Sequence, residues 1–325
     1  MENIGKSAFK SLLIALLFVF SSQSFGQTMQ EAQQAFNAGV QKIDDQPKEA
    51  LAHFNEAIEI SEQLGPDAEQ IIIKSENQLP ICHYNIARQE YRNKNMSAAI
   101  EAFKKASETG EMFNDDVKSK ADRVLAQYYK NNGKKAYSAD NYDEALKNLE
   151  MAEKYNGDDP ELYYLEGLTY RKKENFDEMK TAFEEAIEIG KEQKEMGIAR
   201  KAEQMAISTF MQNGNSAREQ GNFEQAIEFY NGVKSFDPEN PEVYYGMATV
   251  YNKLPDYDKA IEAANKALEY MEDDNEKKAK VYYELGVAYK KQNNKSQACE
   301  AFSNAAYGDF KANAEYEMEH VLECN

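Results

Sequence analysis

The chain has 325 residues, with 57 acidic and 38 basic side chains, a net charge of −19 and 42% hydrophobic residues. This apolar content excludes wholesale disorder. The deficit of Lys and Arg argues against nucleic-acid binding, because phosphate contacts need basic side chains in excess. The 16 Gly and 7 Pro are few turn residues for such a length, which argues against an all-β sandwich or barrel.

Residues 1–26 have the features of a cleaved secretory signal. A basic start precedes the unbroken apolar run of residues 12–20, and the small residues Ser24 and Gly26 stand at the −3 and −1 places before Gln27. The run is too short to span a bilayer, which takes about 20 apolar residues. The alternative is an uncleaved anchor. Cleavage removes one acid and two bases, so the mature chain of residues 27–325 has a net charge of −20.

A repeated pattern of small and large residues fills the rest of the chain. Seven times, a small residue is followed twelve positions later by Ala or, once, Met, and four residues further on a large side chain usually stands. The small pairs are Ala38/Ala50, Ala87/Ala99, Gly133/Ala145, Gly167/Met179, Gly214/Ala226, Ala248/Ala260 and Gly286/Ala298. The residues four positions further are Phe54, Phe103, Leu149, Phe183, Tyr230, Ala264 and Phe302. Such spacings place each set on one face of a helix, so each copy predicts two closely packed helices joined by a turn.

Polar residues mark the expected start of each second helix. They are Asn95, Asn141, Asn175, Asn222, Asp256 and Asn294. Several, such as Asn141, Asn175 and Asn222, have Glu or Gln three places on, as in a capping box. Three intervals between copies are longer than the others, and we expect long first helices over 67–93, 114–138 and 192–219, with Pro80 beginning or bending the first of them.

This pattern resembles the tetratricopeptide repeat. The best copies are VYYELGVAYKKQNNKSQACEAFSNA at 281–305 and ELYYLEGLTYRKKENFDEMKTAFEEAIEI at 161–189. The resemblance implies an all-α fold, a right-handed α-solenoid of about seven repeats with some extended first helices and a capping helix over 309–322. The repeats are expected near 31–64, 80–113, 126–159, 160–193, 207–240, 241–274 and 279–312.

In this family the first helices line a concave groove that holds peptide segments or partner helices. Carried onto this chain at positions 5, 9 and 12 of copies three to seven, the resemblance implies a groove lined by aromatic, aliphatic and basic side chains. These are Lys130, Lys134, Tyr137, Tyr164, Leu168, Arg171, Met211, Asn215, Arg218, Tyr245, Thr249, Asn252, Tyr283, Val287 and Lys290. One interpretation is a surface that attracts acidic groups of a partner. The other is that the tyrosines pack between repeats while the lysines lie at solvated edges. A subset of the family clamps a C-terminal carboxylate with Lys and Asn at positions 5 and 9, but Lys134 stands where Asn is needed, so that clamp is not predicted.

Three cysteines, Cys82, Cys299 and Cys324, leave at least one unpaired within the chain. Export would favour a disulfide. Cys299 and Cys324 flank an expected turn near Gly308 and could pair, and the alternative is that all three are small buried hydrophobic residues.

No enzymatic motif was found. The three His residues are isolated, and no metal-binding, phosphate-binding or nucleophile motif occurs, so the sequence predicts no metal, no cofactor and no catalytic residue. We expect a non-enzymatic scaffold for protein–protein interaction in the cell envelope, binding a partner protein or peptide in the groove. The expected location is the periplasm, including a peripheral place at the outer membrane. The alternative is a structural component of an envelope secretion or outer-membrane assembly.

Overall fold

The computed structural model describes residues 28–324, which contain helices and no strand. They form two compact units, residues 28–125 and 126–324, and the boundary falls inside one helix, α7 (Asp115–Ser138). The expectation of an all-α fold is confirmed. The proposed signal of residues 1–26 lies outside the described residues. Among the helices that are described, none is long and apolar enough to cross a membrane.

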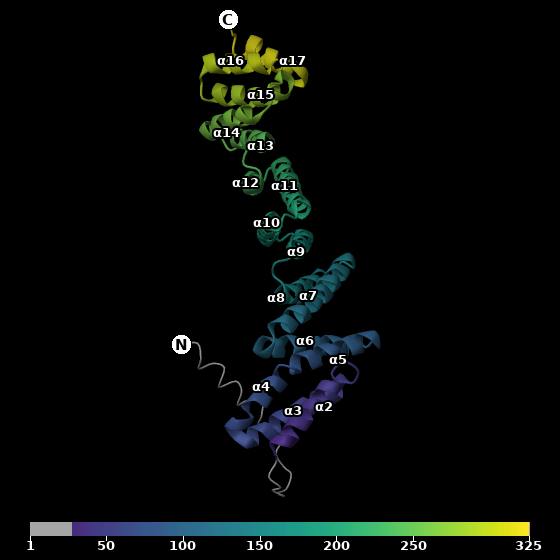
Figure 1. Cartoon of the computed structure of the whole chain (residues 1–325). Helices are drawn as coiled ribbons and strands as arrows, with labels where there is room; N and C mark the ends of the chain where they lie inside the picture. Colours follow the sequence, from purple (N-terminus) through teal and green to yellow (C-terminus); the bar gives the residue numbers. More distant parts are fainter. Residues whose placement is uncertain (1–27, 325) are drawn as a thin grey trace. The chain divides into compact units, whose positions relative to one another are not determined.

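The first unit is built from helices that pack in chain order (Figure 1). Helix α2 (Met29–Lys42) lies against α3 (Pro47–Leu64), and α5 (Leu79–Arg92) lies against α6 (Met96–Phe113). A 3-10 turn (Gly65–Ala68) and the short helix α4 (Glu69–Glu76) connect the two pairs. The start of α7 then packs on α6, where Ser107 donates a hydrogen bond to Asp122.

The second unit continues the pairing. After α7 come the pairs α9 (Pro160–Lys172) with α10 (Phe176–Glu192), α11 (Met196–Glu219) with α12 (Phe223–Phe236), α13 (Pro241–Lys253) with α14 (Tyr257–Tyr270), and α15 (Asn275–Lys291) with α16 (Lys295–Ala305). Helix α7 itself pairs with α8 (Tyr142–Tyr155), since a Cβ on Gly133 of α7 would lie 2.8 Å from the side chain of Leu149. Residues 28–324 thus hold seven helix pairs, as the repeat pattern predicts.

Two of the three predicted long helices form, and one does not. Helix α7 and helix α11 have 24 residues each and match the expected spans 114–138 and 192–219. The prediction of one helix over 67–93 is wrong, because Asn77 and Gln78 form a turn that separates α4 from α5. Pro80 lies in the first turn of α5, where a residue without an N–H fits best, so it begins a new helix.

The turn inside each pair has a conformation that the sequence did not reveal. The residue before the second helix's N-cap has left-handed φ in five pairs: Lys94 (62°), Asp140 (57°), Glu174 (59°), Gly221 (80°) and Asn293 (62°). The six predicted polar residues are all N-caps, but only Asp256 and Asn294 accept a backbone hydrogen bond through their side chains. At Asn141 the side chain donates to Glu144 instead, so the capping boxes expected at Asn141, Asn175 and Asn222 are wrong.

The small and large residues meet inside each pair as predicted. A Cβ added at Gly167 would lie 2.5 Å from the ring of Phe183, and one at Gly286 would lie 2.8 Å from the ring of Phe302. The first copy departs from the predicted register, because Gly39 and not Ala38 faces Phe54. Its turn has four residues, 43–46, whereas the turn of each later pair has three.

The chain ends in a C-terminal cap, residues 308–324, that is not one helix. A 3-10 turn (Gly308–Phe310), the six-residue helix α17 (Lys311–Tyr316) and a π turn (Glu317–Val321) replace the continuous helix expected over 309–322. The backbone N–H of Cys324 donates to the carbonyl of Met318, six residues earlier. This wider turn brings Cys324 beside Cys299, with Cα atoms 5.8 Å apart, and the two form a disulfide.

The contact between α8 and α9 contains a partly buried acid. Glu166 of α9 accepts no hydrogen bond from any described residue, and Glu153 and Glu150 of α8 lie near it. Burial, with help from these two carboxylates, raises the pKa of Glu166 from 4.5 to about 7. Between about pH 4.3 and 7, the Glu166 carboxyl is therefore protonated in the folded chain and ionised in the unfolded chain.

This proton makes stability fall as pH rises from about 4.3 to 7, because the folded state binds more protons than the unfolded state in that window. Glu166→Gln removes the charge and nearly keeps the shape. We expect it to raise the unfolding free energy by about 1–2 kcal/mol at pH 8 and to have little effect at pH 4.5. Urea unfolding at both pH values measures this, with Glu188→Gln on exposed α10 surface as the control. Equal effects of Glu166→Gln at the two pH values would contradict the assignment.

Candidate functional site

Four of the expected groove residues meet at one hollow in the second unit. Met211, Asn215 and Arg218 of α11 and Tyr245 of α13 line a space of about 390 Å³. The other lining residues are Ile207, Ser208, Asn240 and Glu242. We call this space the Tyr245 hollow.

The helix spacing places these side chains. Ile207, Met211, Asn215 and Arg218 follow one another at intervals of four, four and three, so they form one stripe along α11. Gly214 lies one residue off this stripe and lets Tyr230 approach α11, since a Cβ there would lie 2.8 Å from the Tyr230 ring. The stripe is thus fixed by the packing of its own helix pair.

Hydrogen bonds hold two of the lining side chains in place. The Tyr230 hydroxyl donates to Oδ1 of Asn215 at 2.8 Å. Asn240 is the N-cap of α13, and its Oδ1 accepts from the backbone N–H groups of Glu242 and Val243 at 3.1 and 3.4 Å. The amides at the start of α13 are therefore already bonded.

The Tyr245 ring forms one wall of the hollow. Lys280 of α15 lies over it, with Nζ 4.7 Å from the ring centroid, and also pairs with both carboxylate oxygens of Glu242 at 2.6 and 2.7 Å. Burial raises the pKa of Tyr245, and the nearby Glu284 carboxylate raises it further, while Arg218 lowers it. This tyrosine therefore stays neutral at physiological pH.

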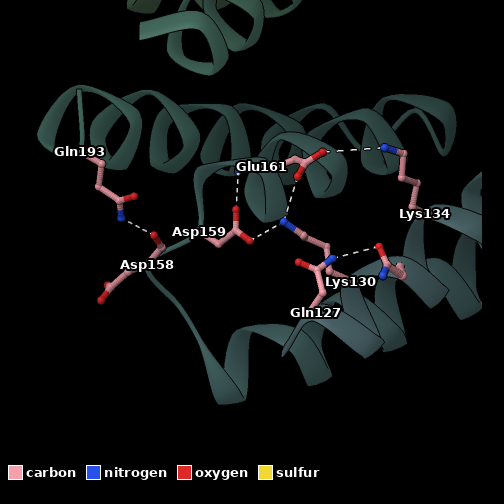
Figure 2. Close-up of polar contacts among 8 residues, drawn as sticks. Gln127, Lys130, Lys134, Asp158, Asp159, Glu161 and Gln193 are labelled. Carbon is pink, nitrogen blue, oxygen red and sulfur yellow. Dashed lines mark hydrogen bonds and ion pairs between the residues drawn. The ribbon is translucent and has the colours of Figure 1, made fainter. Parts of the chain in front are cut away.

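The remaining expected groove residues serve mainly as contacts between neighbouring helices. In Figure 2, Lys130 of α7 points at Asp159 and Glu161 of α9, with Nζ–O distances of 2.6 and 2.9 Å. Burial lowers the pKa of Lys130, but the hydrogen bonds that its ammonium donates to these carboxylates outweigh burial and raise the pKa above its ordinary value. Lys134 lies 3.8 Å from Glu161. Lys130 borders a second, more acidic hollow of about 500 Å³.

The other expected groove residues of copies three, four and six also contact side chains or backbone within the fold. Tyr137 and Tyr164 lie against the rings of Tyr142 and Phe183, and Leu168 packs on the core. The Nε of Arg171 is buried without a hydrogen-bond partner in the described chain. Thr249 donates to the carbonyl of Tyr245 in its own helix.

The expected groove residues of copies six and seven also contact neighbouring helices. The Asn252 amide donates to the Glu284 carboxylate at 2.7 Å. Burial raises the pKa of Glu284, although Asn252, Lys253 and Arg218 all lower it. The C-terminal cap covers Tyr283, Val287 and Lys290, and Lys290 pairs with Glu317 at 2.6 Å. These residues thus make contacts within their own repeat or with the next one, and neither interpretation of the sequence describes all of them. The Tyr245 hollow brings four other expected groove residues together.

Sequence reasoning missed several residues around the hollow. Ser208 and Glu242 each lie three residues before an expected groove position, Met211 and Tyr245, and so share its helix face. That spacing could have found both. Lys280 belongs to the next repeat, and no local signal connects it with Tyr245.

Comparisons with known proteins identify the repeats. Family models described as TPR repeat or tetratricopeptide repeat match residues 160–191, 214–254, 241–274 and 280–306. Human tetratricopeptide repeat protein 28 is 32% identical over 102 residues, and the STIP1 homolog of Dictyostelium discoideum is 33% identical over 111 residues. These stretches cover 31% and 33% of this chain, but only 4% and 20% of the two relatives.

The chain also matches solved structures of helical repeat proteins, three of which are described here. A tetratricopeptide repeat protein from Parabacteroides merdae is 16% identical, with a TM-score of 0.32, and the match covers 91% of this chain and 100% of that one. YrrB, described as a TPR protein with an unusual peptide-binding site, is 20% identical with a TM-score of 0.31 over 59% and 90% of the two chains. MamA from Desulfovibrio magneticus is 19% identical with a TM-score of 0.30 over 56% and 93%. From the matched repeat models, the part of the chain between residues 160 and 306 is built of tetratricopeptide repeats.

Proposed function

We propose that this protein is a non-enzymatic scaffold that holds a segment of a partner protein in the Tyr245 hollow. The tetratricopeptide repeat fold is a protein–protein interaction scaffold. The observation that supports this site is the convergence of Met211, Arg218 and Tyr245 from two consecutive first helices on a hollow of about 390 Å³. Tyr and Arg are among the residue types that carry most of the binding energy at protein interfaces, and Met is enriched there.

Tyr245→Ala is expected to weaken partner binding by about tenfold or more, because it removes the ring that walls the hollow. The partner is first captured in the native host by a photo-crosslinker at Tyr245, with Glu262 on exposed α14 surface as the control position. Its affinity for purified variants is then measured. Tyr244→Ala is the matched control, because the Tyr244 hydroxyl donates to the carbonyl of Pro238 and its ring lies against Tyr270, away from the hollow.

The crosslinking result also separates the two candidate roles. Capture from Tyr245 alone supports a groove-binding scaffold. Capture mainly from Glu262, or of large membrane complexes from both positions, would contradict it and favour a structural component of an envelope assembly.

The proposed location is the cell envelope, after export by the signal of residues 1–26. The support is the sequence pattern of that segment. Fractionation of the native host followed by N-terminal sequencing tests it. The expected result is a periplasmic protein that begins at Gln27, and a cytoplasmic protein that retains the first 26 residues would contradict it.

A further inference from the structure

Arg218 is the charged side chain of the Tyr245 hollow that the fold leaves without a partner. The other charged lining residue, Glu242, is already paired, because both of its carboxylate oxygens accept hydrogen bonds from Lys280. In residues 28–324 the Arg218 guanidinium makes no ion pair within 4.0 Å and no hydrogen bond. A guanidinium carries five donors in a fixed fork, so this side chain retains a large unused capacity for binding.

The nearest buried acid does not neutralise it. Glu284 is close enough to Arg218 for each to affect the other, but it lies beyond ion-pair distance and accepts its hydrogen bond from Asn252. Tyr230 and Tyr245 also lie near Arg218, and both are neutral hydroxyls with raised pKa values. The hollow therefore presents one positive charge without an ion-pair partner in the described chain, in a protein whose net charge is −19.

We propose that the Tyr245 hollow selects partner segments in which an Asp or Glu side chain pairs with Arg218 while a neighbouring apolar side chain packs against Met211 and Tyr245. This inference rests on the proposed function and names the chemistry of its ligand. A carboxylate matches the guanidinium fork with two parallel hydrogen bonds, which gives direction as well as energy. Partial enclosure by the hollow strengthens such a pair relative to one on open surface.

The carboxylate belongs to a side chain and not to the end of a chain. A terminal carboxylate needs several donors at once, such as the free backbone N–H groups of a helix start or the Lys and Asn pair of the clamp described above. Here the Asn240 side chain already accepts from the first amides of α13. The Asn215 oxygen accepts from Tyr230, so this side chain retains only its Nδ2 group as a donor. One guanidinium and one amide are left to provide the recognition, which suits a single acidic side chain.

The test uses the full mature chain and a library of random twelve-residue peptides blocked at both ends by acetylation and amidation. Peptides retained by the wild type and lost with Tyr245→Ala define binding at the hollow. We expect this set to be enriched in Asp and Glu next to apolar residues. Arg218→Gln should remove the acidic enrichment and weaken individual peptides by about tenfold or more. Arg218→Glu should reverse the preference towards Lys and Arg. Thermal melts check that each variant folds.

Arg200→Gln is the matched control, because Arg200 is an exposed arginine on the same helix, α11, outside the hollow. It should leave the acidic enrichment unchanged. Tyr245-dependent peptides without acidic enrichment, or an unchanged preference in Arg218→Glu, would overturn the inference while leaving the proposed function in place. A library without any Tyr245-dependent peptide would overturn both. If only peptides with a free C-terminus bind, the choice of a side-chain carboxylate is wrong.

Discussion

Leucine in place of Gly167 is expected to lower the unfolding free energy by about 3 kcal/mol or more. A Cβ on this residue would lie 2.5 Å from Cδ1 and Cε1 of Phe183, which is closer than a van der Waals contact allows. Phe183 is fully buried in the core of the second unit, so the ring has no free space to enter. Helices α9 and α10 would have to move apart, and the loss should centre on this pair.

Urea unfolding of the wild type and of Gly167→Leu measures the change, and amide hydrogen exchange of α9 and α10 locates it. Gly197→Ala is the control, because Gly197 also lies in a helix, α11, but a Cβ there meets no atom within 4 Å. That variant should change stability by no more than about 1 kcal/mol, and in the favourable direction. Wild-type stability in Gly167→Leu would show that Gly167 does not face Phe183.

The same contact explains why the fold could be predicted. The positions of Gly167 and Phe183 follow from the spacing of residues within one helix pair, and that spacing is visible in the sequence. Gly214 with Tyr230 and Gly286 with Phe302 repeat it. Where local chemistry changes, the pattern fails. In the first copy the four-residue turn moves the small position to Gly39, and Pro80 splits the helix expected over 67–93.

The site was harder to predict from the sequence than the fold, because contacts between repeats decide which side chains remain without a partner. Lys130 and Arg218 are both basic residues at expected groove positions. Lys130 meets Asp159 and Glu161 of the following first helix, whereas Arg218 meets no carboxylate at pairing distance. The two residues stand at different groove positions, 5 and 12, and whether each meets a carboxylate depends on which acids the following repeat carries, which no spacing within one copy encodes.

Reduction of the Cys299–Cys324 disulfide is expected to destabilise the C-terminal cap by about 3–4 kcal/mol, the usual effect of opening a loop of this size. Helix α17 has six residues, too few for a helix that is stable by itself. Without the disulfide, the cap is held by Phe310, Met318 and Leu322, which pack around α15 and α16, and by the pair of Lys290 with Glu317. Amide exchange over residues 311–323 should accelerate by at least about tenfold in dithiothreitol.

The double variant Cys299→Ser with Cys324→Ser should reproduce the reduced state and show no response to dithiothreitol. Cys82 provides an internal control, because burial raises the pKa of its thiol to about 12, and iodoacetamide should modify only the other two cysteines in the reduced folded protein. Exchange over α13 and α14 should stay unchanged, since these helices lie outside the closed loop. If residues 311–323 remain equally protected after reduction, the packing of Met318 and Leu322 alone holds the cap. In that case the disulfide adds nothing to the stability of the cap, contrary to the expected loss of about 3–4 kcal/mol.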